Sequence, residues 1–83
     1  MCLFYILHSY CLDKYYIGHT CDKIEERVRK HNTNHKGFTG KANDWIVKLT
    51  EKYPTKQQAY QRERQVKAWK SRTAIENLIQ NSI

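Results

Sequence analysis

The most informative acidic residue of this sequence is Glu63, because it lies in a basic segment predicted to be helical. It follows Ala59 by four residues and precedes Val66 by three and Lys70 by seven. This spacing places Glu63 on the helix face that should contact a sheet. A carboxylate in that position is costly unless it is paired or binds a metal. We therefore consider ligation of a divalent cation as the functional role. The structural alternatives are a side chain that extends its carboxylate to solvent and an ordinary i,i+4 ion pair with Lys67.

A second pair of chemically capable side chains is Arg27 and His31, which are four residues apart on another predicted helix. Ile24 and Val28 share their helix face, so both side chains can point toward the edge of the core. Inward-facing His and Arg can transfer protons and stabilise the charge of a phosphate. The ordinary alternative is the margin of an amphipathic helix, with Arg27 paired to an acidic residue.

Tyr5 and Tyr16 fall on adjacent strands of a predicted hairpin, and Gly18 follows two residues later. A glycine inside a strand often marks a place where another group approaches closely. A tyrosine hydroxyl that faces a cleft can transfer a proton. Aromatic packing across neighbouring strands is the structural alternative.

Six elements must position these side chains. We predict strands over residues 3–10, 14–19 and 44–53. We predict one helix from a capping box at residues 22–25 to about residue 32 and a second from Thr55 to about residue 70. A last short helix is predicted to be capped by residues 73–76. Residues 32–43 are polar and are predicted to form a loop. The first strand is apolar on both faces, which predicts a central position in the sheet. The order β-β-α-β-α-α predicts one small α+β domain over residues 1–83.

The positive charge is distributed unevenly along this chain, whose net charge is +7. Residues 1–20 contain one basic residue, Lys14, whereas residues 52–72 contain seven basic residues and only Glu63 as an acid. A one-sided positive field attracts polyanions such as nucleic acid. Charges that serve only solubility are the alternative. No apolar run approaches the length that spans a bilayer, so we expect no membrane contact.

The three cysteines, Cys2, Cys11 and Cys21, are an odd number and contain no Cys-x-x-Cys. This pattern favours reduced thiols and a cytoplasmic protein over a disulfide framework. Cys21, His31 and His35 could be considered zinc ligands, but the paired cysteines typical of a structural zinc site are missing.

Together, four short motifs resemble the GIY-YIG nuclease domain, in particular its stand-alone single-domain bacterial members. They are Leu3-Phe4-Tyr5, Tyr16-Ile17-Gly18, the Arg-x-x-x-His pattern of residues 27–31, and the helix segment 59–63 that ends in Glu63. In the first motif Leu3 and Phe4 replace the family's glycine and isoleucine, so only the tyrosine is kept. The resemblance extends from residue 3 to about residue 79.

The resemblance implies a three-stranded antiparallel sheet flanked by helices and hydrolysis of DNA phosphodiester bonds with one divalent cation, Mg²⁺ or Mn²⁺. Glu63 would bind the cation and Tyr5 would act as general base. Because an ordinary tyrosine is too weak a base at pH 7, Tyr5 would need cationic help from Lys14, Arg27 and His31. Tyr16 would hydrogen-bond the scissile phosphate or the attacking water, and Arg27 would also neutralise developing charge.

The expected partner is duplex or branched DNA, in repair or recombination. Candidate DNA contacts are Gly18, Arg62, Arg64, Lys67, Lys70, Arg72 and Asn77. Two alternatives are a non-catalytic nucleic-acid-binding module on the same fold and a structural or partner-binding domain whose charges serve solubility. The joint presence of the two tyrosines, Arg27, His31 and Glu63 favours the nuclease, because a decayed enzyme is expected to have lost at least one of them.

Overall fold

The computed structural model describes residues 1–33 and 42–82. Its elements are β1 (Cys2–Ser9), β2 (Lys14–Thr20), α1 (Ile24–Asn32), β3 (Trp45–Tyr53), α2 (Lys56–Ala68) and α3 (Arg72–Asn81). The predicted order β-β-α-β-α-α is confirmed. The loop predicted over residues 32–43 lies partly outside the described residues, and its first residue belongs to α1. None of the described helices has the length and apolar character needed to span a membrane.

The sheet is antiparallel throughout, with the strand order β2-β1-β3. β1 is central, as its apolar character on both faces predicts, and nearly all of its residues are buried. Its pairing with β2 places Tyr5 opposite Gly18 and Leu7 opposite Tyr16. The pairing with β3 shifts register between Ile6 and Leu7. The hairpin β1–β2 therefore brings the two predicted tyrosines to the same face of the sheet.

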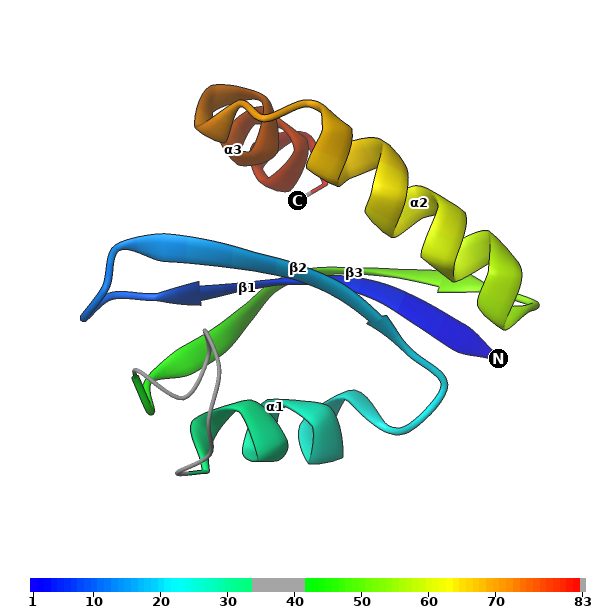
Figure 1. Cartoon of the computed structure of the whole chain (residues 1–83), viewed down its shortest axis with the longest axis horizontal. Coiled ribbons are helices and arrows are strands. Elements are labelled where there is room, and N and C mark those ends of the chain that lie inside the picture. Colours follow the sequence, from blue (N-terminus) through cyan, green and yellow to red (C-terminus); the bar gives the residue numbers. More distant parts are fainter. Residues whose placement is uncertain (34–41, 83) are drawn as a thin grey trace.

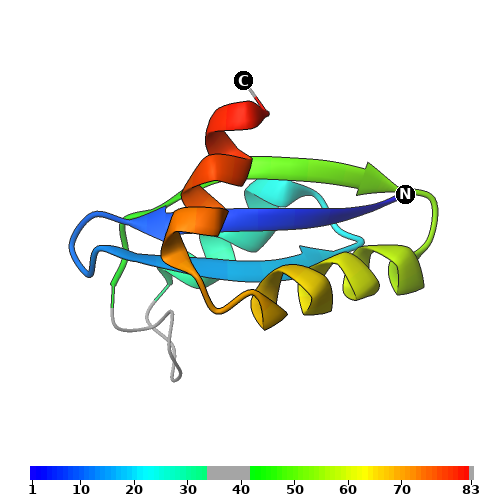
Figure 2. The same ribbon diagram turned by 90° about the horizontal axis from the view of Figure 1, so that it is seen from above.

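Helices cover both faces of this sheet, α1 on one side and α2 with α3 on the other (Figure 1). The α1 face has a core of Tyr5, Leu7 and Trp45. The opposite face has a core of Phe4, Ile6, Ile17, Leu49 and Val66. Each large apolar side chain removed from water contributes about 1.5–3 kcal/mol to folding. A view from above shows α2 running beside the edge strand β2 and α3 crossing over the strands (Figure 2).

Two of the three predicted helix caps differ from the structure. Thr55 caps α2 as predicted, because its hydroxyl accepts a hydrogen bond from the backbone N–H of Gln58 at 3.3 Å. The predicted capping box at Asp22 is wrong, since Lys23 is the N-cap and makes no side-chain cap bond. The backbone N–H of Asp22 instead donates to the Thr20 hydroxyl in the turn after β2. α3 begins at Arg72, two residues earlier than predicted, because Ser71 and not Thr73 serves as its cap.

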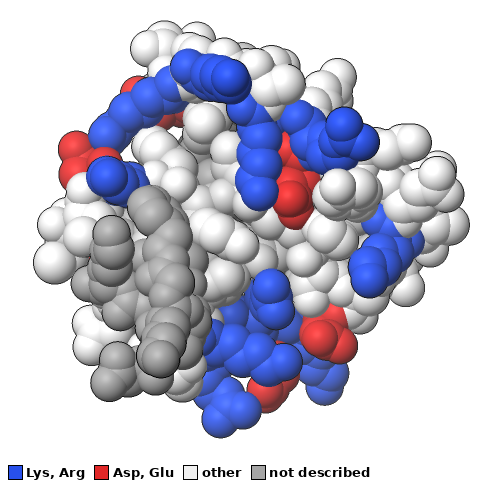
Figure 3. Space-filling view, viewed as in Figure 1, with Lys and Arg blue, Asp and Glu red and all other residues white. Residues whose placement is uncertain are grey.

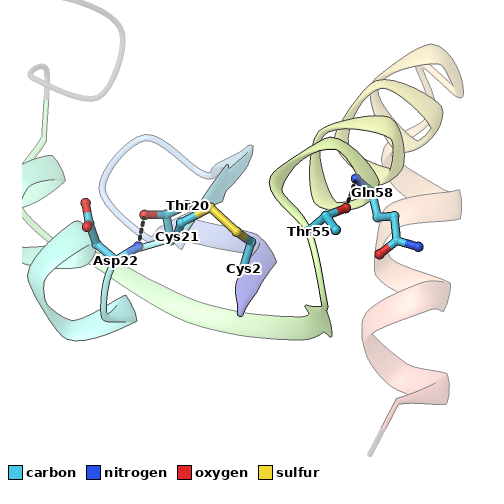
Figure 4. The surroundings of a disulfide bond; sticks show 6 residues. All are labelled: Cys2, Thr20, Cys21, Asp22, Thr55 and Gln58. Carbon is cyan, nitrogen blue, oxygen red and sulfur yellow. Dashed lines mark hydrogen bonds between the residues drawn. A yellow bond between two sulfur atoms is a disulfide. The ribbon is translucent and has the colours of Figure 1, made fainter.

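The prediction of reduced cysteines is also wrong for two of the three. Cys2 and Cys21 form a disulfide (Figure 4), and Cys11 is free and exposed. The physical reason is the register of the hairpin: Leu3 pairs with Thr20, so residues 2 and 21 are the next facing positions. The sequence spacing of these cysteines did not reveal this proximity. The expectation of a cytoplasmic protein loses the support that it drew from reduced thiols.

Candidate active site

The hydroxyl of Tyr5 is the centre of a hydrogen-bonded cluster beneath α1. Arg27 donates from Nε to the Tyr5 hydroxyl at 3.2 Å. His31 Nε2 lies 3.0 Å from the same oxygen. Tyr5 is only 1% exposed, and His31 is also buried. The expectation that Arg27 and His31 point toward the core is therefore confirmed, and their common partner is a tyrosine of the first motif.

α1 places Arg27 and His31 on one helix face because they are one helical turn apart. Ile24 and Val28 of the same helix pack against the sheet and hold that face inward. Asn32, at the end of α1, exchanges two hydrogen bonds with the backbone of Trp45, at 2.8 and 3.0 Å. These bonds tie the C-terminal end of the helix to β3 and fix the position of His31.

Gly18 is required by the position of Tyr5 on the neighbouring strand. A Cβ atom at residue 18 would lie 2.6 Å from the Tyr5 hydroxyl oxygen and 2.7 Å from the ring carbon that carries it. The close approach predicted for this glycine is thus made by Tyr5. The expected DNA contact of Gly18 stays a prediction. Tyr16 completes the cluster, since its ring centroid is 4.7 Å from that of His31 and 6.3 Å from that of Tyr5.

The pKa of the Tyr5 hydroxyl is not lowered, as it would be in a tyrosine that acts as a base in its phenolate form. Burial raises the pKa of the Tyr5 hydroxyl above its ordinary value, although the hydrogen bond from Arg27 opposes this effect. The charge of Glu63 also raises the pKa of Tyr5, which shows that the carboxylate lies within electrostatic range of the cluster. Tyr5 is therefore protonated at neutral pH. To take up another proton it must pass its own to a neighbour, and His31 is in hydrogen-bond contact.

Glu63 lies on α2 at the β2 edge of the sheet, and its side chain is 12% exposed. The predicted sheet-facing position is confirmed. So is the predicted ion pair with Lys67, whose Nζ is 3.0 Å from Glu63 Oε2. The second carboxylate oxygen, Oε1, lies 2.7 Å from His19 Nδ1. Sequence reasoning missed His19, although strand alternation places residue 19 on the same face as Ile17, which packs beneath α2.

The donor set around Glu63 suits a hard cation held by few protein ligands. Among the described residues, no group of three or more His, Cys, Asp or Glu side chains could hold a metal ion. Mg²⁺ commonly binds through one or two carboxylates and keeps waters or substrate phosphates as its other ligands. Glu63 supplies one such carboxylate, and the half-exposed ammonium group of Lys67 beside its Oε2 is the group that a metal ion would displace. The residues present therefore fit a cation bound by one carboxylate.

A small cleft lies next to these groups, between the end of β2 and the first turns of α1 and α2. Its volume is about 330 Å³, and it is lined by His19, Thr20, Cys21, Asp22, Arg27 and Lys56. Arg27 and His19 belong respectively to the Tyr5 cluster and to the Glu63 cluster. The cleft therefore gives solvent access between the two clusters. Lys56 and Arg27 provide it with positive charge suited to a phosphate.

The remaining predicted site residues are dispersed over the surface. Lys14, predicted to assist Tyr5, lies at the start of β2, four residues from Gly18. Arg62 pairs with Glu51 of β3 at 2.9 Å, and Arg72 pairs with Asp13 and with Glu76. Arg64 lies over the ring of Tyr60, and Asn77 lines a shallow depression on α3 with Tyr15, Lys48, Glu76, Ile79 and Gln80. Among the predicted DNA contacts on the helices, Lys67 touches a catalytic candidate, since it donates to Glu63.

Comparison with known protein families gives a match to the GIY-YIG catalytic domain over residues 1–77 of the 83. The chain therefore belongs to the GIY-YIG family, a family of nucleases. The three-stranded antiparallel sheet with helices on both faces agrees with this assignment. Neither the curated proteins nor the solved structures include a significant match to the chain.

Proposed function

We propose that this protein is a metal-dependent DNA endonuclease that hydrolyses phosphodiester bonds. The observation that carries the proposal is the Tyr5 hydroxyl, which is buried between the Nε of Arg27 and the Nε2 of His31. A buried tyrosine that serves only packing needs one hydrogen-bond partner. Here a cation and an imidazole converge on one phenolic oxygen at the margin of a positively charged cleft.

In the proposed reaction, Tyr5 and His31 move the proton of the attacking water. The water gives a proton to the Tyr5 oxygen while the hydroxyl proton of Tyr5 passes to His31 Nε2, so the tyrosine remains neutral overall. This relay requires the tautomer of His31 whose Nε2 is unprotonated. It also explains how a tyrosine with a raised pKa can assist catalysis at neutral pH. Arg27 holds the phenolic oxygen in place and offers its remaining guanidinium donors to the phosphate.

Glu63 is the residue that would hold the divalent cation. Mg²⁺ or Mn²⁺ bound there would stabilise the negative charge on the phosphate and on the leaving oxygen. Lys67 would release the carboxylate oxygen that it contacts and pair with a substrate phosphate instead, since both are anionic acceptors for its ammonium group. His19 would keep the other carboxylate oxygen oriented.

The decisive experiment compares cleavage of labelled duplex, flapped and branched DNA by the wild type, Tyr5→Phe and Glu63→Gln in Mg²⁺, Mn²⁺ or EDTA. We expect the wild type to cleave only with a divalent cation. Tyr5→Phe should reduce the rate about 10²–10⁴-fold, which is the usual contribution of a general base. Glu63→Gln should abolish cleavage while DNA binding persists. Cleavage by Glu63→Gln at the wild-type rate would rule out the proposed mechanism.

One observation favours a second function, a nucleic-acid-binding module without catalysis. Both oxygens of Glu63 already have partners, His19 and Lys67, so the carboxylate is satisfied without a metal. The two functions predict different thermal stabilities. If Glu63 binds the cation, Mn²⁺ should raise the Tm of the wild type and leave that of Glu63→Gln unchanged, because only a ligand that binds the folded state stabilises it. An equal response of the two proteins to Mn²⁺ supports the binding module.

A further inference from the structure

A second, larger groove lies along the outer edge of β2, where this strand meets the junction of α2 and α3. We call it the edge groove. Its volume is about 410 Å³, a size typical of a site for one small organic group. Ile17, Val66 and Ile75 provide its apolar surface, and Tyr15, which packs on the same face of the sheet, adds an aromatic ring. Tyr16 also lines the groove, although its side chain packs against the core of the opposite face. This lining suits a flat, partly apolar group.

The rim of the edge groove is basic. Lys14, Lys67, Lys70 and Arg72 contribute four cations, and Asp13 is the one acid among the lining residues. Arg72 and Asp13 pair with each other at 2.6 Å, so their charges largely cancel. Lys67 is paired with Glu63, which does not line the groove, so the lining residues taken together carry a net positive charge. Figure 3 shows Lys and Arg side chains gathered over the α2–α3 side of the molecule and again over the α1 side, with an uncharged area between them.

Lys70 is held in an unusual backbone conformation on this rim. Its φ of 48° lies in the left-handed region, just after the C-cap residue Trp69. Glycine normally occupies this position at a helix end, because a side chain is strained there. Within the described part of the chain, no hydrogen bond or ion pair of the Lys70 side chain compensates for the strain. Strained residues of this kind concentrate at binding and catalytic sites.

Two residues that line the edge groove also contact residues of the proposed active site. Tyr16 lines the groove, and its ring also packs against His31. Lys67 lines the groove and donates to Glu63. A ligand in the groove would therefore lie next to a phosphate held by the catalytic residues.

We propose that the edge groove binds one unpaired nucleotide of the substrate, adjacent in the strand to the phosphate that is cleaved. Its base would pack against Tyr15 and the apolar floor, with Tyr16 on the side of the active site, and its phosphate would contact Lys67 and Lys70. Stacking on aromatic rings combined with a basic rim is how proteins bind single strands without reading their sequence. A paired base within a duplex cannot offer its faces in this way. The inference rests on the proposed nuclease function and defines its substrate as DNA with a single-stranded flank.

The test is a binding titration in EDTA, where cleavage cannot interfere. The ligands are a short single strand, a set of strands that each carry one abasic site at a different position, and a blunt duplex of equal length. The key variant is Lys70→Gly, which removes the cation and also relieves the left-handed strain. Lys52→Met, on an exposed position of β3 outside the groove, controls for the loss of one positive charge.

We expect Lys70→Gly to raise Tm by several degrees and yet weaken single-strand binding. The slope of log affinity against log salt should fall by about 0.7, the value of one phosphate contact on a single strand. Lys52→Met should leave this slope unchanged. One abasic position should weaken wild-type binding more than the others. Equal effects of Lys70→Gly and Lys52→Met, or equal binding of all abasic strands, would overturn the proposal.

The cleavage assay separates this proposal from the proposed function. Lys70→Gly should reduce activity on flapped DNA more than it reduces activity on blunt duplex. If the wild type cleaves DNA but Lys70→Gly reduces cleavage of flapped DNA and of blunt duplex equally, the groove assignment fails and the nuclease function stands. If no DNA is cleaved under any condition while groove binding persists, the nuclease function fails instead.

Discussion

At the scale of single residues, the chemistry of the site depends on one phenolic oxygen and on what surrounds it. Tyr5 is not activated by a lowered pKa, because burial raises the pKa of its hydroxyl. It contacts an imidazole at 3.0 Å and a guanidinium at 3.2 Å. In the proposed reaction these contacts would make the tyrosine a proton carrier rather than a permanent phenolate.

The raised pKa of Tyr5 predicts how stability depends on pH. Because the folded state holds the Tyr5 proton more tightly than the unfolded state, this contribution is constant below about pH 10 and is lost as the pH rises above it. Tyr5→Phe should cost about 1–3 kcal/mol at pH 7, since Arg27 and His31 lose a buried partner. Urea denaturation from pH 7 to pH 11 should show the unfolding free energies of the wild type and Tyr5→Phe converging above pH 10. Burial also raises the pKa values of Tyr15 and Tyr53. Both residues are present in both proteins, so their titration cancels in the difference. A difference that stays constant to pH 11 would contradict the assignment.

Gly18→Ala should damage the site through a steric clash with Tyr5. The new methyl group would lie 2.6 Å from a hydroxyl oxygen that belongs to a buried side chain of the central strand. We expect a loss of about 1–3 kcal/mol in unfolding free energy, and a loss of cleavage comparable to that of Tyr5→Phe. Combining the two substitutions provides the control: their effects on cleavage should not add, because both act on the same hydroxyl. Additive losses would indicate an independent role for Gly18.

At the scale of the elements, the hairpin β1–β2 and the helix α1 form the frame of the Tyr5 cluster. The disulfide joins Cys2 at the start of β1 to Cys21 just after β2, in the segment that leads into α1. It therefore restrains the entry to the helix that carries Arg27 and His31. The cleft beside Arg27 is itself lined by Cys21.

Loss of this disulfide should destabilise the fold. With a sequence separation of 19 residues, its removal should cost about 3 kcal/mol by the chain-entropy argument. Thermal unfolding of Cys2→Ser should therefore show a Tm lower by roughly 10–20 °C, using the usual relation for domains of this size. Cys11→Ser is the matched control, since Cys11 is free and exposed, and its Tm should equal that of the wild type. A reducing agent should lower the Tm of the wild type and not that of Cys2→Ser.

At the scale of the whole molecule, the charge distribution should govern how the protein encounters and binds DNA. Part of the net charge of +7 is committed to internal pairs, since Arg62 binds Glu51 and Arg72 binds Asp13 and Glu76. Lys67 is likewise paired with Glu63, so phosphate contacts should come from Lys70, from Lys67 once it exchanges Glu63 for a phosphate, and from the cations near Arg27. Binding should therefore involve few phosphates and little reading of base sequence.

We expect DNA affinity to fall steeply with salt. Three phosphate contacts correspond to a loss of roughly 20- to 40-fold between 50 and 200 mM salt, because each contact releases a condensed counterion. Fluorescence anisotropy with two unrelated sequences of equal length should give the same slope for both. Affinity that is insensitive to salt, or that differs strongly between the sequences, would show that base contacts dominate.

The amino-acid sequence alone determined the order of elements, the central place of β1 and the inward faces of α1 and α2. Each of these follows from local periodicity: β1 is apolar on both faces, and Arg27, His31 and Glu63 have helical spacing relative to apolar neighbours. The same periodicity places Tyr5 and Tyr16 on one hairpin. The resemblance of the motifs to the GIY-YIG family is confirmed by the family match.

Only the tertiary structure decided which of these side chains meet. The hydrogen bonds of Tyr5 span 22 and 26 residues and that between His19 and Glu63 spans 44, so no local pattern contains them. The disulfide depends in the same way on the register of two strands rather than on the spacing of its cysteines. Helix boundaries shifted for a related reason: Ser71 caps α3 because the chain turns after α2 in the left-handed conformation of Lys70, which sequence patterns do not specify. Long-range contacts arise when separate elements pack on one sheet, and their geometry is a property of that packing.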